Sequence, residues 1–362
     1  MDRRSFIKKA GLATGAAATA AAFPMPAIAQ GMMELKMVMT WPKNYPALGT
    51  GAQRVCDRIA TMTEGRIKVT LFGAGELVPP FESFDAVSQG TADMYQGAEY
   101  YWQGKHKGFN FFAAVPMGLT ASEMNAWVHY GGGQELWDEL AGGFGIKSFL
   151  AGNTGAQMGG WFREEVNTPE DLKGLTFRMP GFGGEVLRKV GMNAVALPGA
   201  EIFPALQAGT IDATEWVGPW LDLAFGFQKI VKFYYGPGFH EPGTALAIGI
   251  NKGVWDKLSP TDQEIVKTAC HAENGIMYDE INANNGPALD ELINKHGVQV
   301  KRFSDEIFET FAKASEELIP TLIDDDLGQR IFDSFSAARK NIGSWTNLQE
   351  RSFVELRAKF VA

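Results

Sequence analysis

The chain has 362 residues and is acidic, with 33 lysines and arginines against 42 aspartates and glutamates and a formal net charge of −9. Basic residues are scattered or stand beside acids, as in Arg163-Glu164-Glu165, so no basic cluster can neutralise a phosphate backbone. This excludes a nucleic-acid-binding protein. A hydrophobic content of 45% is typical of a globular protein, and the length suits two lobes better than one core.

The first residues have the pattern of a secretory signal. Arg3-Arg4 and Lys8-Lys9 form a charged start, and a weakly apolar run from Ala10 to Phe23 follows. This run is shorter than the ~20 apolar residues that span a bilayer, and a small-x-small cleavage site ends at Ala29. We interpret residues 1–29 as a twin-arginine signal peptide and expect the mature chain in the periplasm.

The two cysteines, Cys56 and Cys270, are then expected in an oxidising compartment. They either pair there or remain buried as small apolar side chains, which is common for free cysteine. Their spacing does not decide between the two.

Strand and helix patterns alternate after the signal. Leu35–Trp41 and Arg66–Phe72 alternate as strands, whereas Gly49–Thr63 and Phe81–Val87 have helical spacing. The order strand, helix, strand, helix predicts a mainly parallel sheet covered by helices. Ligands are then expected at the carboxyl ends of the strands.

The same alternation returns in the second half of the chain. Strand patterns occur at residues 147–152, 160–162, 175–178, 194–197 and 213–216, with helical patterns between them. From residue 260 the pattern is helical, most clearly over 261–294 and 305–314. The last segment, 344–361, places large apolar residues near one face, and these are Trp345, Leu348, Phe353, Leu356 and Phe360.

Motifs of common catalytic sites do not occur in the sequence. The five histidines are far apart, and none lies in an HExxH or C-x-x-C context. Dinucleotide, P-loop and hydrolase-elbow signatures are also incomplete. The glycine clusters 131–133 and 181–184 are more typical of tight turns than of phosphate sites.

Three segments gather polar groups where strands end, and their motifs resemble one known family. These segments are 152–157, 176–181 and 209–219. Together with 75–79, 251–252 and 258–260, they resemble the extracytoplasmic solute receptors of tripartite ATP-independent periplasmic (TRAP) transporters, the DctP-like family. The resemblance covers essentially the whole mature chain. Residues 153–155, 157–162 and 212–216 are similar to the subgroup that binds 2-oxo acids such as pyruvate, or lactate, together with a cation.

The resemblance implies that Arg178 clamps the carboxylate of the solute. The chemistry of the residue agrees, because a guanidinium fork grips a carboxylate through two parallel hydrogen bonds, which lysine does not reproduce. A structural salt bridge is the alternative role for a partly buried arginine.

Glu215 would repel an anionic solute unless a cation lies between them. The resemblance implies that the positions of Gln157, Glu215 and Trp216, the last through its main-chain carbonyl, hold Na+ or Ca2+, and we add Glu241. Oxygen donors of this kind suit either ion. The alternative is that Glu215 only pairs with Arg178.

Four further side chains are candidates for the solute cleft. Tyr101, in the run Tyr100-Tyr101-Trp102, either walls the cleft or packs in the core, since neighbouring residues of a strand point to opposite faces. Phe182 and Trp216 are expected to close over the solute. Asn153 is either a hydrogen-bond donor or a turn former.

We therefore expect an α/β fold of the type II-like periplasmic binding protein kind, with two lobes, a hinge and a helical C-terminal region. Lobe I comprises residues 30–152 and 242–285, and lobe II residues 153–241 and 286–340. Residues 341–362 are expected to form a C-terminal helix, and the resemblance implies a homodimer through this segment. The partner implied by the resemblance is the TRAP membrane permease.

Two other functions remain open from the sequence. One is an exported enzyme that acts on a carboxylic acid with a metal ion and with Glu215 as base. The other is a receptor for a dicarboxylate or a sugar acid, because an arginine clamp recognises only one carboxylate.

Overall fold

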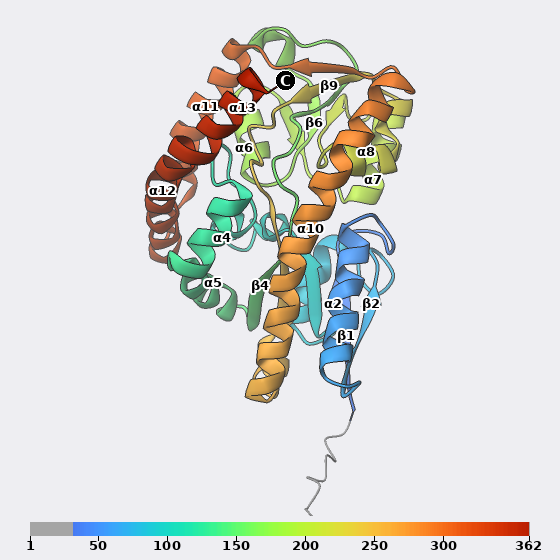
Figure 1. Cartoon of the computed structure of the whole chain (residues 1–362), viewed down its shortest axis with the longest axis vertical. Helices are drawn as coiled ribbons and strands as arrows, with labels where there is room; N and C mark the ends of the chain where they lie inside the picture. The colour runs from blue at the N-terminus through green and yellow to red at the C-terminus, as the bar shows by residue number, and fades with distance from the viewer. Residues whose placement is uncertain (1–31, 362) are drawn as a thin grey trace, which may run out of the picture. The chain divides into compact units, whose positions relative to one another are not determined.

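Two mixed β-sheets with helices around them organise the chain (Figure 1). The computed structural model describes residues 32–361. The predicted signal peptide, residues 1–29, lies outside the described residues. Across residues 32–361, no helix combines the length and the apolar character that crossing a bilayer requires.

The first sheet has five strands in the order β2-β1-β3-β10-β4. Strand β1 pairs in parallel with β2 and β3, whereas β10 runs antiparallel to β3 and β4. The strands are β1 (Met33–Met39), β2 (Ile67–Phe72), β3 (Met94–Gly97), β4 (Ile146–Asn153) and β10 (Ala245–Asn251).

The second sheet has six strands in the order β11-β9-β5-β8-β6-β7. Strand β5 is antiparallel to β8 and β9, and the other pairings are parallel. The strands are β5 (Gly160–Phe162), β6 (Thr176–Arg178), β7 (Asn193–Val195), β8 (Ala213–Thr214), β9 (Phe233–Gly236) and β11 (Gln299–Arg302).

The prediction of a mainly parallel sheet is therefore wrong in one respect, because both sheets are mixed. The chain leaves the first sheet after β4 and enters the second as β5, and it returns from β9 to β10. Strand β4 runs toward the second sheet, and β10 runs away from it. The two neighbouring strands are therefore antiparallel. The two crossing segments are residues 154–159 and 237–244.

Amphipathic helices cover the sheets. Helix α2 shows the cause, because Leu48, Ala52, Val55 and Ile59 recur at helical spacing and are all buried. Helices beside the first sheet are α2 (Leu48–Met62), α3 (Ser83–Ser88), α4 (Ala121–Tyr130), α5 (Gly133–Gly142) and α9 (Lys252–Trp255). Those beside the second sheet are α6 (Gly181–Lys189), α7 (Gly199–Ala208), α8 (Pro219–Phe225) and α11 (Asp305–Leu318).

Helix α10 (Pro260–Asn294) has 35 residues and runs along both sheets in Figure 1. It packs on α2 and β4 at the first sheet and on α8 at the second sheet. Ser259 caps its start by accepting a hydrogen bond from the Asp262 N–H, at 3.1 Å. Fully buried Glu273 pairs with Arg54 and Arg58, at 2.6 and 2.9 Å, and so fastens α10 to α2.

Both cysteines are buried and unpaired. Cys56 lies on α2 and Cys270 on α10. They take the role of small apolar side chains in the core.

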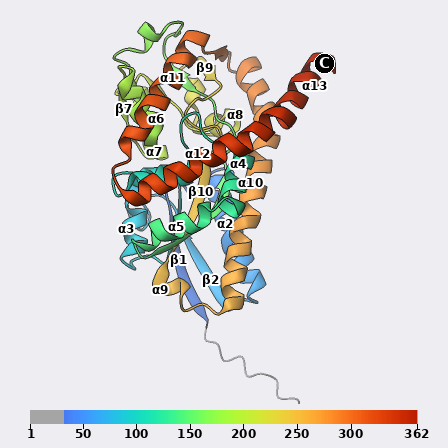
Figure 2. The ribbon, with the colours of Figure 1, turned by 90° about the vertical axis from the view of Figure 1, so that its left-hand side faces the viewer.

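The C-terminal region is helical, as the sequence predicted. Helix α12 (Asp326–Thr346) packs on α4 and α5, and a short π-helical turn (Asn347–Arg351) joins it to α13 (Ser352–Phe360). Figure 2 shows α12 crossing the body and α13 projecting beyond it.

Candidate functional site

The residues with the strongest predicted roles meet at the ends of two neighbouring strands. Arg178 is the last residue of β6, and Glu215 directly follows β8. Strands β6 and β8 are parallel, with Arg178 in register with Thr214. Parallel strands end at the same edge, so the sequence positions 178 and 215 become neighbours in space.

The two crossing segments bring further polar groups to this edge, because they hydrogen-bond to each other. The Thr154 N–H donates to the Thr244 carbonyl at 3.0 Å, and the Gln157 N–H donates to the Glu241 carbonyl at 3.1 Å. The Gly238 N–H donates back to the Gln157 carbonyl at 2.8 Å. These bonds place Gln157, Glu241 and Thr244 side by side.

Arg178 is only 1% exposed, and two of its three guanidinium nitrogens are already bonded. Nε donates to the Leu197 carbonyl at 3.0 Å, and Nη1 donates to the Glu215 carboxylate at 2.5 Å. Nη2 is buried and has no hydrogen-bond partner. The guanidinium carbon lies 5.4 Å from the centre of a Trp216 ring, in cation–π range. The fork is therefore held in place with one nitrogen left for a ligand.

The Gln157 side chain is oriented in a similar way. Its amide nitrogen donates to the hydroxyls of Thr154 and Thr244, at 3.0 and 3.2 Å. Its amide oxygen is buried and has no partner. The Thr154 hydroxyl already donates to the Gly155 carbonyl, and that of Thr244 donates to Glu241, so both can only accept from Gln157 and its amide oxygen is the free atom.

A buried acidic group adjoins Arg178. Ligand atoms of Glu215, His240 and Glu241 all lie within 4.8 Å of one another. His240 Nε2 is 3.6 Å from a Glu215 oxygen, and the Thr244 hydroxyl donates to Glu241. Burial, and then the charge of Glu215, raises the pKa of Glu241 to about 7. Two carboxylates so close together would be stabilised by a bound cation.

Aromatic and apolar residues form most of the wall of a small cavity at this site. Tyr100 and Tyr101 both line it. The sequence analysis expected only one of them to face the cavity, because neighbouring residues of an extended segment point to opposite faces. The structure instead has a 3-10 turn at Glu99–Trp102, with about three residues per turn. The complete lining is Trp41, Leu48, Ala98, Tyr100, Tyr101, Thr154, Gln157, Arg178, Trp216, Val217, Thr244 and Leu246.

Four predicted residues are not among the lining side chains: the proposed metal ligands Glu215 and Glu241, which adjoin Arg178 and Thr244, and the proposed solute contacts Asn153 and Phe182. Asn153 accepts a hydrogen bond from the Gly155 N–H at 2.8 Å, as a turn former does, while its amide nitrogen has no partner. The buried ring of Phe182 packs on Phe111, with centroids 5.7 Å apart. The solute-binding roles of Asn153 and Phe182 stay predictions.

Three residues of the site were missed by the sequence analysis. They are His240, Thr154 and Thr244, and each acts on a residue that was predicted. His240 adjoins Glu241 in the chain, and this His-Glu pair was the one available signal.

Comparisons with known proteins identify the family of the chain. The family model DctP, described as bacterial extracellular solute-binding protein, family 7, matches residues 37–325. The chain is 39% identical to a monocarboxylate 2-oxoacid-binding periplasmic protein of Nostoc sp., over 98% of both chains. The family is one of solute receptors, which argues against the exported enzyme.

Two solved structures resemble the whole fold. One is a TRAP transporter solute-binding protein from Bordetella bronchiseptica, a mixed-occupancy dimer with copurified calcium and picolinate. It is 33% identical, with a TM-score of 0.89 over 91% of this chain and 98% of that one. The other, from Pseudoalteromonas atlantica with bound sodium and pyruvate, is 37% identical, with a TM-score of 0.87 over 90% and 99%. The family match and these likenesses confirm the resemblance that the motifs indicated: this chain belongs to the DctP family, family 7 of the bacterial extracellular solute-binding proteins.

Proposed function

We propose that this protein is the periplasmic receptor of a TRAP transporter and captures a small monocarboxylate, a 2-oxo acid such as pyruvate, or lactate. It does so together with Na+ or Ca2+ and delivers the solute to the membrane permease. The observation that carries this proposal is the unpartnered Nη2 of buried Arg178. A buried donor without a partner costs about 1–3 kcal/mol, and a solute carboxylate would remove that cost.

The pairing of Arg178 with Glu215 is part of this function and not an alternative to it. Glu215 occupies Nη1 and leaves Nη2 free, so the ion pair aims the fork at the cavity. The cavity is desolvated and of low dielectric, where a charge-assisted hydrogen bond to the solute is strong.

The residues beside Arg178 fit an oxygen-coordinating cation. The free amide oxygen of Gln157 and the carboxylates of Glu215 and Glu241 are hard oxygen donors, as Na+ and Ca2+ require. We propose these three and the Trp216 carbonyl as the ligands. When bound, the cation supplies the positive charge that offsets repulsion between the carboxylates and the solute.

The cavity favours a monocarboxylate over a dicarboxylate. Arg178 is the only cationic side chain among the residues that line it, and the unpartnered indole nitrogens of Trp41 and Trp216 are neutral donors. A second carboxylate would therefore be buried without a cationic side chain of its own, which is costly.

Calorimetry with a panel of acids tests the proposal. Pyruvate, 2-oxobutyrate and lactate are to be compared with succinate and gluconate, each with Na+, with Ca2+ and with a chelator in a potassium buffer. We expect pyruvate, 2-oxobutyrate and lactate to bind more tightly than succinate and gluconate, and all three to bind more weakly without Na+ or Ca2+. Tighter binding of succinate or gluconate would contradict the proposal.

Tyr45 is expected to control how long the solute stays bound, although it does not line the cavity. Its hydroxyl donates to the Leu221 carbonyl of α8. Its ring packs on those of Trp216 and Phe225, with ring centroids 6.2 and 4.5 Å apart. Tyr45 follows β1 of the first sheet, whereas its partners lie beside the second sheet. These contacts therefore join the parts of the chain around the two sheets, with the solute between them. Such contacts stabilise the form that encloses it.

Replacing Tyr45 with phenylalanine keeps the ring and removes the hydrogen bond, which is worth about 1 kcal/mol. We expect pyruvate to dissociate about 3- to 10-fold faster, with little change in association, as measured by stopped-flow tryptophan fluorescence. Tyr235→Phe is the matched control, since its hydroxyl bonds only to the Val166 N–H beside the second sheet. Equal dissociation rates in the Tyr45 variant and the wild type would refute this role.

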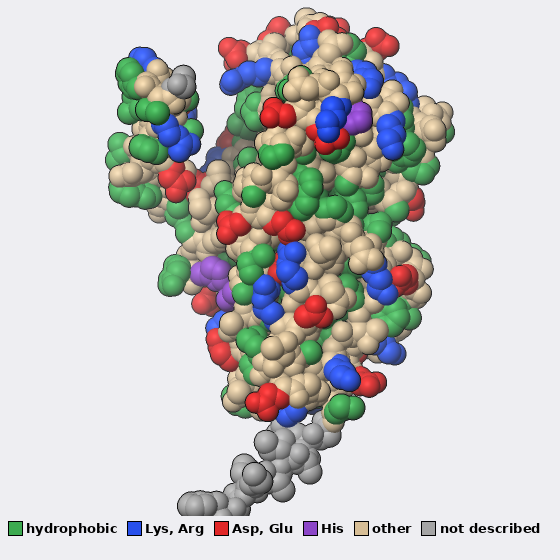
Figure 3. All heavy atoms as spheres, turned by 45° about the vertical axis from the view of Figure 1, so that its right-hand side comes forward, with side chains coloured by type: hydrophobic (Ala, Val, Ile, Leu, Met, Phe, Trp, Pro, Cys, Tyr) green, Lys and Arg blue, Asp and Glu red, His purple; other side chains and the backbone are tan. Residues whose placement is uncertain are grey.

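We also propose that residues 1–29 direct export by the twin-arginine pathway and that the protein forms a homodimer through residues 341–362. The second proposal is supported by α13, whose apolar side chains are exposed on the projecting arm in Figure 3. Leu348 is 70% exposed, Phe353 60% and Phe360 70%. A relative crystallised as a dimer. Exposed apolar side chains concentrated in one segment mark an interface.

Removal of residues 344–362 is expected to leave a monomer that still binds pyruvate with unchanged affinity. Light scattering after size exclusion measures the mass. Phe353→Asp tests the same surface in the full-length chain, and Glu350→Gln on the adjoining turn is the control. A dimer that persists after truncation would place the interface elsewhere.

A further inference from the structure

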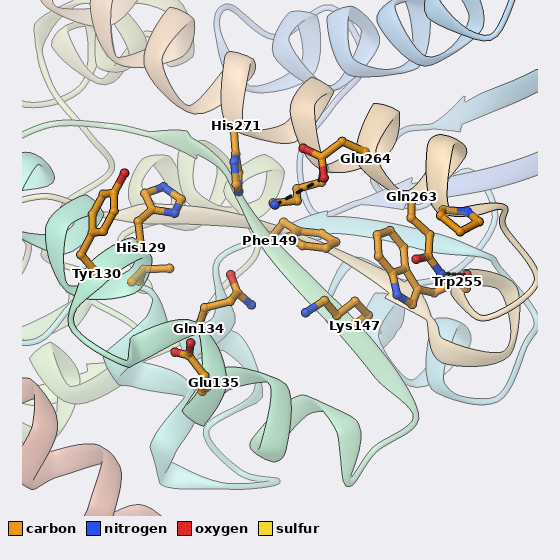
Figure 4. Close-up of a pocket in the computed structure, with 13 residues that line it drawn as sticks. His129, Tyr130, Gln134, Glu135, Lys147, Phe149, Trp255, Gln263, Glu264 and His271 are labelled. Carbon is orange, nitrogen blue, oxygen red and sulfur yellow. Dashed lines mark hydrogen bonds and ion pairs between the residues drawn. The ribbon is translucent and has the colours of Figure 1, made fainter.

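A solvent-open pocket of about 700 Å3 lies away from the solute cavity, between α4, α5, β4 and α10 (Figure 4). Its size is within the usual range of ligand pockets. Phe149 of β4 and Trp255 form an aromatic wall, with ring centroids 5.1 Å apart. None of its lining residues belongs to the solute cavity. The proposed function does not use this pocket.

Two histidines meet in this pocket from different helices. His129 is near the C-terminal end of α4, and the side chain of His271 extends from α10 into the same pocket, as Figure 4 shows. Their ring centroids are 4.7 Å apart at an interplanar angle of 70°. Nε2 of His271 is buried and has no hydrogen-bond partner. The pair thus offers an imidazole nitrogen that has no other partner among the described residues.

The spacing of the rings is that of two imidazoles on one metal ion. Zinc–nitrogen bonds of about 2.1 Å place each ring centroid roughly 3.2 Å from the ion, so an angle of about 90–110° separates the centroids by roughly 4.5–5.2 Å. The observed 4.7 Å lies in this interval. We propose that His129 and His271 bind a divalent transition-metal ion of the zinc type in this pocket.

Glu264 lines the same pocket, two helical turns before His271 on α10. Among the described residues, its carboxylate does not come within 4.8 Å of both imidazoles, so the two histidines are the protein ligands. Glu264 pairs with Lys267, at 3.5 Å, and their side chains are 67% and 44% exposed. This pair offsets the positive charge of Lys267, which also lines the pocket. Water completes the coordination.

The remaining charges of the pocket leave room for a cation. Lys147 is paired with Asp138, and Glu135 adds a further negative charge to the lining. Imidazole nitrogens suit zinc, nickel and copper, whereas Na+ and Ca2+ prefer oxygen donors. The site is therefore chemically distinct from the oxygen-rich group at Glu215 and Glu241, and Ca2+ does not compete for it.

Calorimetric titration with ZnCl2 tests the proposal on protein saturated with Ca2+ and pyruvate, which occupies the solute site. The wild type is expected to bind one zinc ion. His129→Gln and His271→Gln are each expected to weaken zinc binding 10-fold or more, with unchanged pyruvate affinity. His296→Gln is the matched control, because His296 lies outside the pocket beside Glu291, at 3.7 Å. It is expected to bind zinc as the wild type does.

Two results would overturn the proposal. One is wild-type zinc affinity in both histidine variants. The other is loss of zinc binding in His240→Gln alone, which would place the ion at the solute site. Circular dichroism verifies the fold of each variant. If a variant is unfolded, Ni2+ added to the wild type is expected to broaden the NMR imidazole signals of His129 and His271, and sharp signals would refute the site. Loss of pyruvate binding in the wild type would instead contradict the proposed function.

Discussion

Replacement of Arg178 by methionine is expected to abolish measurable binding of pyruvate. The substitution removes the buried fork and with it the free Nη2 that we assign to the solute carboxylate. It also leaves Glu215 buried without its partner, which typically costs 3–5 kcal/mol, so unfolding is to be measured alongside binding. Calorimetry reports the affinity, and a result near that of the wild type would refute the assignment of the clamp.

Arg178→Lys separates the geometry of the clamp from its charge. Lysine keeps the positive charge beside Glu215 but cannot place one nitrogen on Glu215, a second on Leu197 and a third on the solute. We expect affinity to fall about 100-fold or more, which corresponds to about 2.7 kcal/mol, with a smaller loss of stability than in the methionine variant. Arg188→Lys on the exposed side of α6 is the control, and its affinity is expected to equal that of the wild type.

The parts of the site that follow single strands could be predicted from the sequence. Arg178 ends a short strand and Glu215 directly follows another, and the family motif assigns them a shared role. His240 and Thr244 could not be found in this way. They belong to a crossing segment whose importance depends on its hydrogen bonds to residues 154–159, about 80 positions earlier in the chain. No local pattern encodes that pairing.

Fold prediction succeeded where periodicity is strong and failed where direction matters. Helix α10 was expected over 261–294 and spans Pro260–Asn294, because its apolar spacing and its cap are local features. The antiparallel direction of β5 and β10 is not local, since it follows from the path of the chain between the sheets. The lobe boundaries at 152/153, 241/242 and 285/286 stay predictions.

Glu99 offers a stability test that does not involve the solute. It is fully buried, and burial raises the pKa of its carboxyl to about 7 from the ordinary 4.5. Tyr95 and Trp137 both donate to the same oxygen, at 2.9 and 3.2 Å, whereas the other oxygen is buried without a partner. The site therefore accommodates the neutral carboxylic acid better than the carboxylate.

The sign of the pH effect follows from proton binding. The folded protein holds the Glu99 proton up to about pH 7, and the unfolded chain releases it near pH 4.5. Folding is therefore most favoured by this group below pH 4.5, and that stability is lost as pH rises through 7. At 1.36 kcal/mol for each unit of pKa, the whole effect is about 3 kcal/mol.

Glu99→Gln is expected to stabilise the protein at pH 8 and to reduce the fall in unfolding free energy between pH 5 and pH 8 by about 2–3 kcal/mol. Glutamine is uncharged and keeps the oxygen that Tyr95 and Trp137 bind. Urea denaturation at both pH values measures the effect. Burial also raises the pKa of Asp222 to about 6. Asp222 therefore makes the unfolding free energy fall with pH in the wild type and in the variant alike, so the two profiles must be compared with each other. Glu350→Gln on the surface is the control, and a Glu99 variant with the wild-type slope would show that Glu99 is ionised in the folded protein at pH 5.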